Sequence, residues 1–218
     1  MRSRRTTVFA TVTVTTALVG AASLWGVSAT AAAAPTTLAV LTHANGSSVP
    51  VTSLSAPLAS GTTAKLTTTA GGTTGVTCAT AGFAADVAGN PAAPGTATEN
   101  NVRQTFAPAS CTSTILGTTG VSSITVSSPL TASVTSGGAV TVNGPITATA
   151  VLKSVFGNVT CAYSAPRLDG TANNADHSLS FTDQVFAKGS GSTTCPSTIH
   201  FTAKYAPVSG PDGPVVVN

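Results

Sequence analysis

The feature that most constrains the fold is a strict two-residue alternation near the C-terminus. In residues 199–205, Ile199, Phe201, Ala203 and Tyr205 alternate with polar residues. Successive side chains of a β-strand point to opposite faces of the sheet, so the segment predicts a strand with one buried face. Shorter alternations at residues 130–134 and 159–163 predict further strands of the same kind.

The remainder of the chain after residue 33 has the composition of strands joined by turns. Thr and Val dominate, and both are β-branched residues that favour the pleated sheet. Turn signals occur at residues 71–72, 136–138, 143–145, 157–158 and 212–213, and residues 89–95 form a predicted surface loop. Because no segment shows a capped helical period, the sequence predicts an all-β, disulfide-stapled antiparallel β-sandwich, with two related halves as a variant.

The N-terminal residues have the layout of a secretory signal peptide. Arg2, Arg4 and Arg5 precede an apolar stretch, and small residues suitable for cleavage follow. We predict a signal peptide over residues 1–33, cut after Ala33 or alternatively after Ala31, and a secreted β domain over residues 34–218. A retained membrane anchor is the alternative, and the choice between the general and twin-arginine export routes stays open.

Removal of this segment changes the charge of the protein. The whole chain has 9 Lys and Arg against 6 Asp and Glu, and three of the nine precede residue 34. The predicted mature domain is therefore neutral. A nucleic-acid partner needs a basic face and is excluded, as is attachment to a membrane by a polybasic segment. Membrane contact is expected only through the uncleaved signal.

Four cysteines, Cys78, Cys111, Cys161 and Cys195, all lie in the predicted secreted domain. An even number of cysteines in an exported protein predicts two disulfides. Zinc ligands usually include a C-x₂₋₄-C pair, and these cysteines are too widely spaced for one. No metal or cofactor is therefore expected.

A similarity between two segments of the chain favours one pairing of these cysteines. Residues 75–79 resemble residues 158–162, and the second cysteine of each half follows at 33 or 34 residues. Duplication, with repeats at about 45–127 and 128–218, would make Cys78–Cys111 and Cys161–Cys195 the natural pairs. The alternative is chance similarity in a chain of few residue types.

Common catalytic patterns are absent, and the polar candidates have simpler interpretations. The chain has no nucleophile elbow, zinc-protease motif or phosphate-binding loop. His177 lies between Asp176 and Ser178, but adjacent residues cannot form a catalytic triad. Residues 169–176 are predicted to be a hairpin turn rather than a calcium loop. His200 is expected to be solvated, and His43 to lie in a mobile segment.

Two glycosylation sequons occur, at residues 45–47 and 158–160. The first is expected to be accessible. The second is discounted because it falls in a predicted buried strand.

Several segments of the second half resemble small uncharacterised secreted proteins of actinomycetes, often labelled by a twin-arginine signal domain. The resemblance rests on the signal, on residues 159–163 and 181–186, on Cys195-Pro196 and on the C-terminal residues 205–218. It implies export and a β fold, and it implies no activity. The composition is also similar to that of enediyne-carrying apoproteins, which are secreted β-sandwiches with two disulfides.

These observations predict a non-enzymatic extracellular protein with a structural or binding role at the cell surface or matrix. Its partner would be an unidentified extracellular ligand or cell-surface component. One alternative is a small-ligand carrier with an apolar cleft between sheets. The other is a secreted hydrolase or a protease inhibitor, whose exposed loop would be residues 188–196.

Overall fold

Fifteen β-strands and one short 3₁₀ helix form the regular structure of residues 37–218, the part of the chain that the computed structural model describes. The predicted signal peptide, with its cleavage positions Ala31 and Ala33, lies outside the described residues. The elements are β1 Leu41–His43, β2 Ser53–Pro57, β3 Ala64–Thr67, β4 Gly75–Cys78, β5 Ala81–Gly89, β6 Thr96–Phe106, η1 Pro108–Ser110, β7 Cys111–Ser113, β8 Thr118–Val126, β9 Leu130–Thr135, β10 Ala139–Ser154, β11 Gly157–Asn173, β12 Ser178–Gly191, β13 Thr198–Tyr205, β14 Ser209–Gly210 and β15 Gly213–Val217.

All pairings between these strands are antiparallel, as predicted. Neighbours follow the order β1-β15-β14-β2-β5-β6-β9-β10-β11-β12-β13-β3-β4-β7, and β8 pairs with the second half of β10. The sheet curls strongly, because Leu58, directly after β2, forms a bridge with Tyr205 at the end of β13. The chain therefore folds into a disulfide-linked antiparallel β-sandwich.

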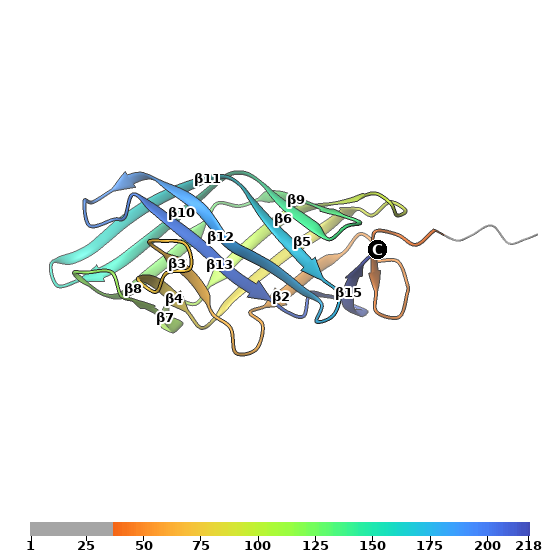
Figure 1. Cartoon of the computed structure of the whole chain (residues 1–218), viewed down its shortest axis with the longest axis horizontal. Helices are drawn as coiled ribbons and strands as arrows, with labels where there is room; N and C mark the ends of the chain where they lie inside the picture. The colour runs from red at the N-terminus through yellow and green to blue at the C-terminus, as the bar shows by residue number, and fades with distance from the viewer. Residues whose placement is uncertain (1–36) are drawn as a thin grey trace, which may run out of the picture. The chain divides into compact units, whose positions relative to one another are not determined.

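The core lies between two layers of the curled sheet. In Figure 1, strands β10 to β13 cross in front of β5, β6 and β9. Phe83 of β5 contacts Phe181 of β12 and Tyr205 of β13, with ring centroids 6.1 and 5.8 Å apart. Phe201 extends this aromatic cluster at 6.1 Å from Phe181. Tilted rings at such separations gain packing energy beyond their buried area.

The predicted alternation of residues 199–205 is confirmed in β13. Ile199, Phe201, Ala203 and Tyr205 are buried, and the residues between them are half-buried. Strand β9 likewise buries Ala132 and Val134. Local period-two patterns thus specified which face of each strand packs into the core.

Both predicted disulfides are present, and they sit in different local structures. Cys78 of β4 and Cys111 of β7 are directly opposite partners on adjacent strands. Cys161 of β11 instead reaches Cys195, in the loop between β12 and β13. The internal duplication that suggested these pairs stays a prediction.

The predicted hairpin turn at residues 169–176 is shorter than expected. Strand β11 continues to Asn173, and only the residues between it and β12 form the turn. Pairing of Gly170 with Phe181 explains the difference, because ladder hydrogen bonds extend the strand into a stretch whose polar composition is typical of turns.

Within residues 37–218, no helical segment has the length and hydropathy that crossing a bilayer would require.

Candidate functional site

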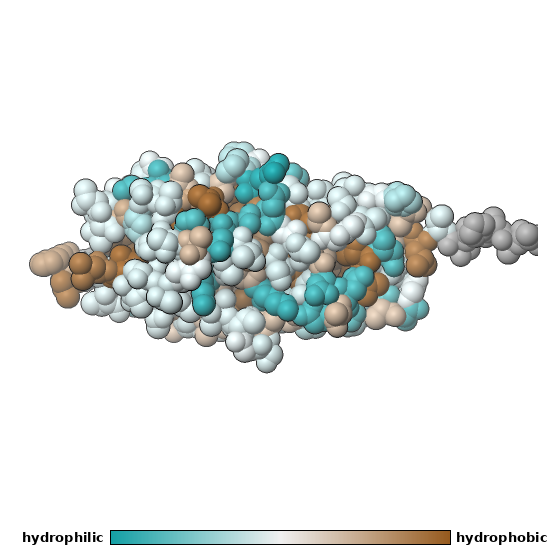
Figure 2. All heavy atoms as spheres, viewed as in Figure 1, coloured by the Kyte–Doolittle hydropathy of each residue, from teal (hydrophilic) through white to brown (hydrophobic). Residues whose placement is uncertain are grey.

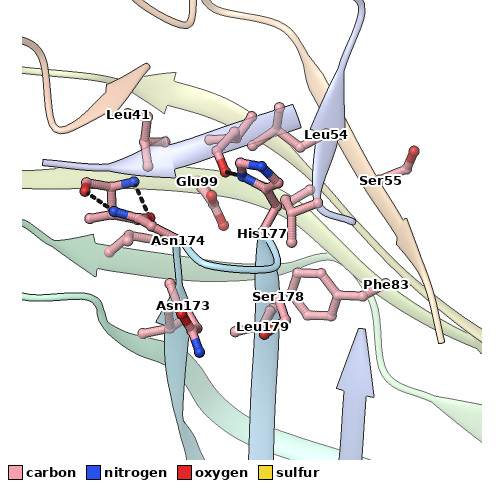
Figure 3. Close-up of a pocket in the computed structure, with 17 residues that line it drawn as sticks. Leu41, Leu54, Ser55, Phe83, Glu99, Asn173, Asn174, His177, Ser178 and Leu179 are labelled. Atoms are coloured by element: carbon pink, nitrogen blue, oxygen red, sulfur yellow. Dashed lines mark hydrogen bonds between the residues drawn. The ribbon is translucent and has the colours of Figure 1, made fainter. Parts of the chain in front are cut away.

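A small cavity, partly open to the surface, lies next to the turn that joins β11 to β12 (Figure 3). Its volume is about 50 Å³. Most of its walls are apolar, and they include Leu41, Leu54, Phe83 and valines of β9, β10 and β15. Glu99 and His177 are the two titratable side chains among the residues that line it. We call this space the Glu99 cavity.

Strand β6 places Glu99 on the buried face of the sheet. Ala97, Glu99 and Val102 are buried, whereas residues 98, 100 and 101 are exposed. The register shifts between Glu99 and Val102, where Asn101 adopts a φ of 49°. Such a bulge lets two consecutive residues face solvent while the next residue returns to the core.

Glu99 is a buried acidic side chain with no ion pair or hydrogen bond from the described residues. Its exposed fraction is 7%, and among the described residues no ion pair includes it. Burial raises the pKa of the Glu99 carboxyl to about 7, with no hydrogen bond or neighbouring charge to oppose the shift. A buried polar group of this kind is costly, and the exceptions in native proteins concentrate at functional sites.

Hydrogen bonds fasten the β11–β12 turn over the cavity. The Asn174 side chain donates to Val217 O at 2.7 Å and accepts from Val217 N at 2.8 Å. His177 Nδ1 donates to Val215 O at 3.2 Å, and His177 O accepts from Val208 N at 2.8 Å. The turn and strand β15 therefore act together as the cover of the Glu99 cavity.

The acidic, histidine and serine residues of this turn do not form a triad. Ser178 Oγ donates to Asp176 Oδ1 at 2.7 Å, while His177 bonds to the β15 backbone instead. Asp176 also pairs with Lys204. His177 therefore takes no part in the hydrogen bond that joins Ser178 to Asp176. The described residues also contain no cluster of three or more His, Cys, Asp or Glu side chains that could hold a metal ion.

A second unusual region lies at the far ends of β8 and β10. Phe156 is 99% exposed, Leu116 is 93% exposed and Val155 is 74% exposed. Ser154 pairs with Thr118, so the turn at 155–156 and the loop at 115–117 project from the same edge. Figure 2 shows a hydrophobic cluster there, in the place that the β10–β11 turn occupies in Figure 1. We call Leu116, Val155 and Phe156 the apolar end.

The turn that carries Val155 and Phe156 is tightly formed. Ser154 Oγ donates to Gly157 O at 2.7 Å and accepts from Phe156 N at 3.2 Å. Gly157 has a φ of 109°, which an L-residue with a side chain rarely adopts. The backbone therefore holds both apolar side chains outward.

Charge is distributed asymmetrically around the apolar end. No acidic residue occurs between residues 100 and 168 or between 184 and 211, and these ranges contain β7, β8, β10 and the β12–β13 loop. Lys153 lies next to the turn and is exposed. The apolar end thus combines exposed hydrophobic groups with a nearby cation, and β8 and β10 carry no carboxylate.

The loop considered for protease inhibition, residues 188–196, is held internally. Lys188 Nζ donates to Cys195 O at 3.1 Å, and Cys195 is bonded to Cys161. The only basic side chain of the loop is therefore engaged within the loop itself.

Two histidine expectations were wrong. His43 lies in β1, is 1% exposed and places its Nε2 3.7 Å from Asp212 Oδ2, because β1 pairs with β15 rather than fraying. His200 is half-buried, and its Nδ1 has no hydrogen-bond partner among the described residues, because β3 covers that part of β13. A single-strand pattern could not reveal either neighbour.

The sequon at Asn158 is also more accessible than predicted. Asn158 and Thr160 are exposed, because both point away from the core at the start of β11. Asn45 is exposed as expected, and its Oδ1 accepts hydrogen bonds from Ser47 N and Ser47 Oγ.

Sequence analysis did not identify Glu99 or the apolar end. The Ala97–Glu99 alternation was the available indication that Glu99 lies on a buried face. The apolar pair Val155-Phe156 beside the turn signal at 157–158 was the available indication of the apolar end. No protein-family model, curated protein or solved structure matches the chain.

Proposed function

We propose that the protein is an exported, non-enzymatic binding protein of the cell surface, and that its apolar end inserts into an anionic lipid surface. The observation that carries the proposal is the exposure of Leu116, Val155 and Phe156 on two loops at the same edge of the sheet. Clustered large hydrophobic side chains on a soluble domain mark interaction surfaces, whereas scattered ones need no explanation.

The chemistry of the surroundings favours lipid over a protein groove. Insertion needs apolar groups at a projecting tip, without carboxylates that anionic headgroups would repel. Both conditions hold at the apolar end, and Lys153 is placed to contact headgroups. This proposal differs from the sequence-based expectation, which allowed membrane contact only through the uncleaved N-terminal signal.

Export is supported by the two disulfides, because such bonds persist mainly in oxidising compartments. The Glu99 cavity is too small to serve the carrier alternative. Sites for drug-sized ligands have volumes of about 300–1,000 Å³, and the Glu99 cavity has about 50 Å³.

Sedimentation with phospholipid vesicles tests the proposal. Burial of a Phe side chain contributes about 2 kcal/mol, so Phe156→Ser is expected to weaken binding about 30-fold. Val155→Ser is expected to weaken it about tenfold on the same scale. Vesicles with anionic headgroups should bind more tightly than zwitterionic vesicles.

Val51→Ser is the matched control. Val51 is exposed to 77%, close to the 74% of Val155, but it lies in the loop before β2. Its replacement should leave vesicle binding unchanged. Equal losses for Val51→Ser and Val155→Ser, or no vesicle binding by the wild type, would reject the proposal.

A further inference from the structure

We propose that the Glu99 cavity binds a small primary ammonium ion, of about methyl- or ethylammonium size, with the Glu99 carboxylate as its counter-ion. The site is separate from the apolar end and does not depend on the function proposed for it. Glu99 is the one lining residue that carries a carboxylate.

The first argument is that the protein itself leaves Glu99 without a partner. The nearby polar groups of the cover are already engaged, since Asn174 bonds twice to Val217 and His177 bonds to Val215. No Lys or Arg lines the cavity. A guest with N–H donors and a positive charge would supply both the hydrogen bonds and the charge that Glu99 lacks.

The second argument concerns the walls. Leu41, Leu54 and Phe83 provide apolar surface next to the carboxyl group. Figure 3 shows Glu99 within the ring of labelled side chains beneath the turn that carries His177. A methyl or ethyl group can pack against such walls while the ammonium head faces Glu99, and an aromatic ring nearby favours a cation further.

The third argument excludes larger or more demanding guests. A metal ion needs several ligands, and among the described residues no cluster of three or more His, Cys, Asp or Glu side chains surrounds such a point. An apolar cavity of about 150 Å³ holds benzene, so a space of about 50 Å³ takes a guest of two or three non-hydrogen atoms. Charge, polarity and volume together specify a short alkylammonium.

Thermal unfolding and titration calorimetry with ethylammonium chloride test the proposal. Sodium chloride at equal ionic strength controls for charge screening, and ethanol controls for size without charge. Ethylammonium is expected to raise the Tm of the wild-type protein above the value in either control, in proportion to the logarithm of its concentration.

Glu99→Gln keeps the shape of the side chain and removes the charge, so it should weaken ethylammonium binding at least about tenfold. Asp169→Asn removes a surface carboxylate on β11 and should leave binding unchanged. Equal stabilisation of the wild type and Glu99→Gln would overturn the proposal, and so would equal stabilisation of the wild type by ethylammonium and sodium. The comparison of ethylammonium with sodium uses the wild type alone, so it decides the question even if Glu99→Gln does not fold.

The pH dependence provides a further readout. Because the pKa of Glu99 is raised to about 7 by burial, affinity should fall about 100-fold between about pH 9 and pH 5 as the carboxylate is protonated. His177 is the other titratable side chain that lines the cavity, so His177→Asn is the control for assigning the pH dependence to Glu99. His177→Asn should therefore retain most of the pH dependence. Loss of that dependence in His177→Asn, with affinity unchanged in Glu99→Gln, would assign the effect to His177 and overturn the proposal. Vesicle binding should be unaffected by Glu99→Gln, so failure at one site is distinguishable from failure at the other.

Discussion

The apolar end exposes hydrophobic side chains to water, whereas the Glu99 cavity buries a carboxyl group without a partner. At the apolar end, large hydrophobic side chains stand in water, with Phe156 almost fully exposed. In the cavity, a carboxyl group is buried among apolar walls. Native domains avoid both situations unless something else is gained, so each region indicates a contact that the isolated chain does not make.

The two regions also differ in how they are held. Cys111 begins the strand that leads into the Leu116 loop, and Cys161 lies on the strand that leaves the Phe156 turn. The cover of the Glu99 cavity has no disulfide and is fastened by hydrogen bonds from Asn174 and His177. Covalent links fix the strands that carry the apolar end, whereas the cover can open without breaking a covalent bond.

The largest expected effect on stability concerns the disulfide between Cys161 and Cys195, which fixes a strand of the apolar end. Cys161→Ala/Cys195→Ala opens a loop with a sequence separation of 34 residues and is expected to lower the free energy of unfolding by about 4 kcal/mol. Chemical denaturation of the oxidised protein measures the loss. A loss below about 1 kcal/mol would mean that hydrogen bonds and packing stabilise both regions alike.

The next largest effect concerns Glu99, whose replacement is expected to raise the free energy of unfolding relative to the wild type as pH rises. The folded state holds the Glu99 proton more tightly than the unfolded chain, since the pKa rises from 4.5 to about 7 on burial. Stability is therefore undiminished below about pH 4, falls as pH rises through this interval, and is lower by up to about 3 kcal/mol above it.

Glu99→Gln removes this titration. The difference in unfolding free energy between the variant and the wild type should grow in favour of the variant by up to about 3 kcal/mol between about pH 4 and pH 8. Denaturation curves at both pH values, without added amine, check the change. A difference that stays constant with pH would show that the pKa of Glu99 is the same in the folded and unfolded states, and would remove the contrast with the apolar end.

A smaller effect is expected at the cover. Asn174→Ala removes both hydrogen bonds to Val217 and should lower stability by about 1–2 kcal/mol. Hydrogen exchange should accelerate selectively at the Val217 and Val208 amides, with little change in β8. Uniform acceleration throughout the domain would mean that the cover does not open independently.

The smallest effect on stability belongs to the apolar end. Phe156 is exposed in the folded protein, so Phe156→Ser should change the free energy of unfolding by less than about 0.5 kcal/mol. The same variant is expected to weaken vesicle binding, and this separation of stability from binding distinguishes the apolar end from a packing role. A large stability loss would show that Phe156 contributes to the fold.

Sequence reasoning succeeded where a property is local. The alternation of Ile199, Phe201, Ala203 and Tyr205 identified both the strand and its buried face, because side-chain direction in a strand follows from the backbone alone. Both disulfide pairs were also predicted, from the similarity between the two segments and the even cysteine count.

Prediction failed where a residue's surroundings come from distant segments. His43 was expected to be mobile, yet it is buried because β1 pairs with β15 from the other end of the chain. Glu99 has an ordinary sequence context, and only the convergence of β1, β6, β11, β12 and β15 encloses it.

The sequence by itself therefore determined the all-β class, the buried faces of the clearest strands and the disulfide framework. The tertiary structure decided where the sheet curls, which carboxyl group is desolvated and which apolar side chains stay in water. The reason is physical: strand periodicity is encoded within a few residues, whereas burial and desolvation depend on long-range pairing that no local pattern specifies.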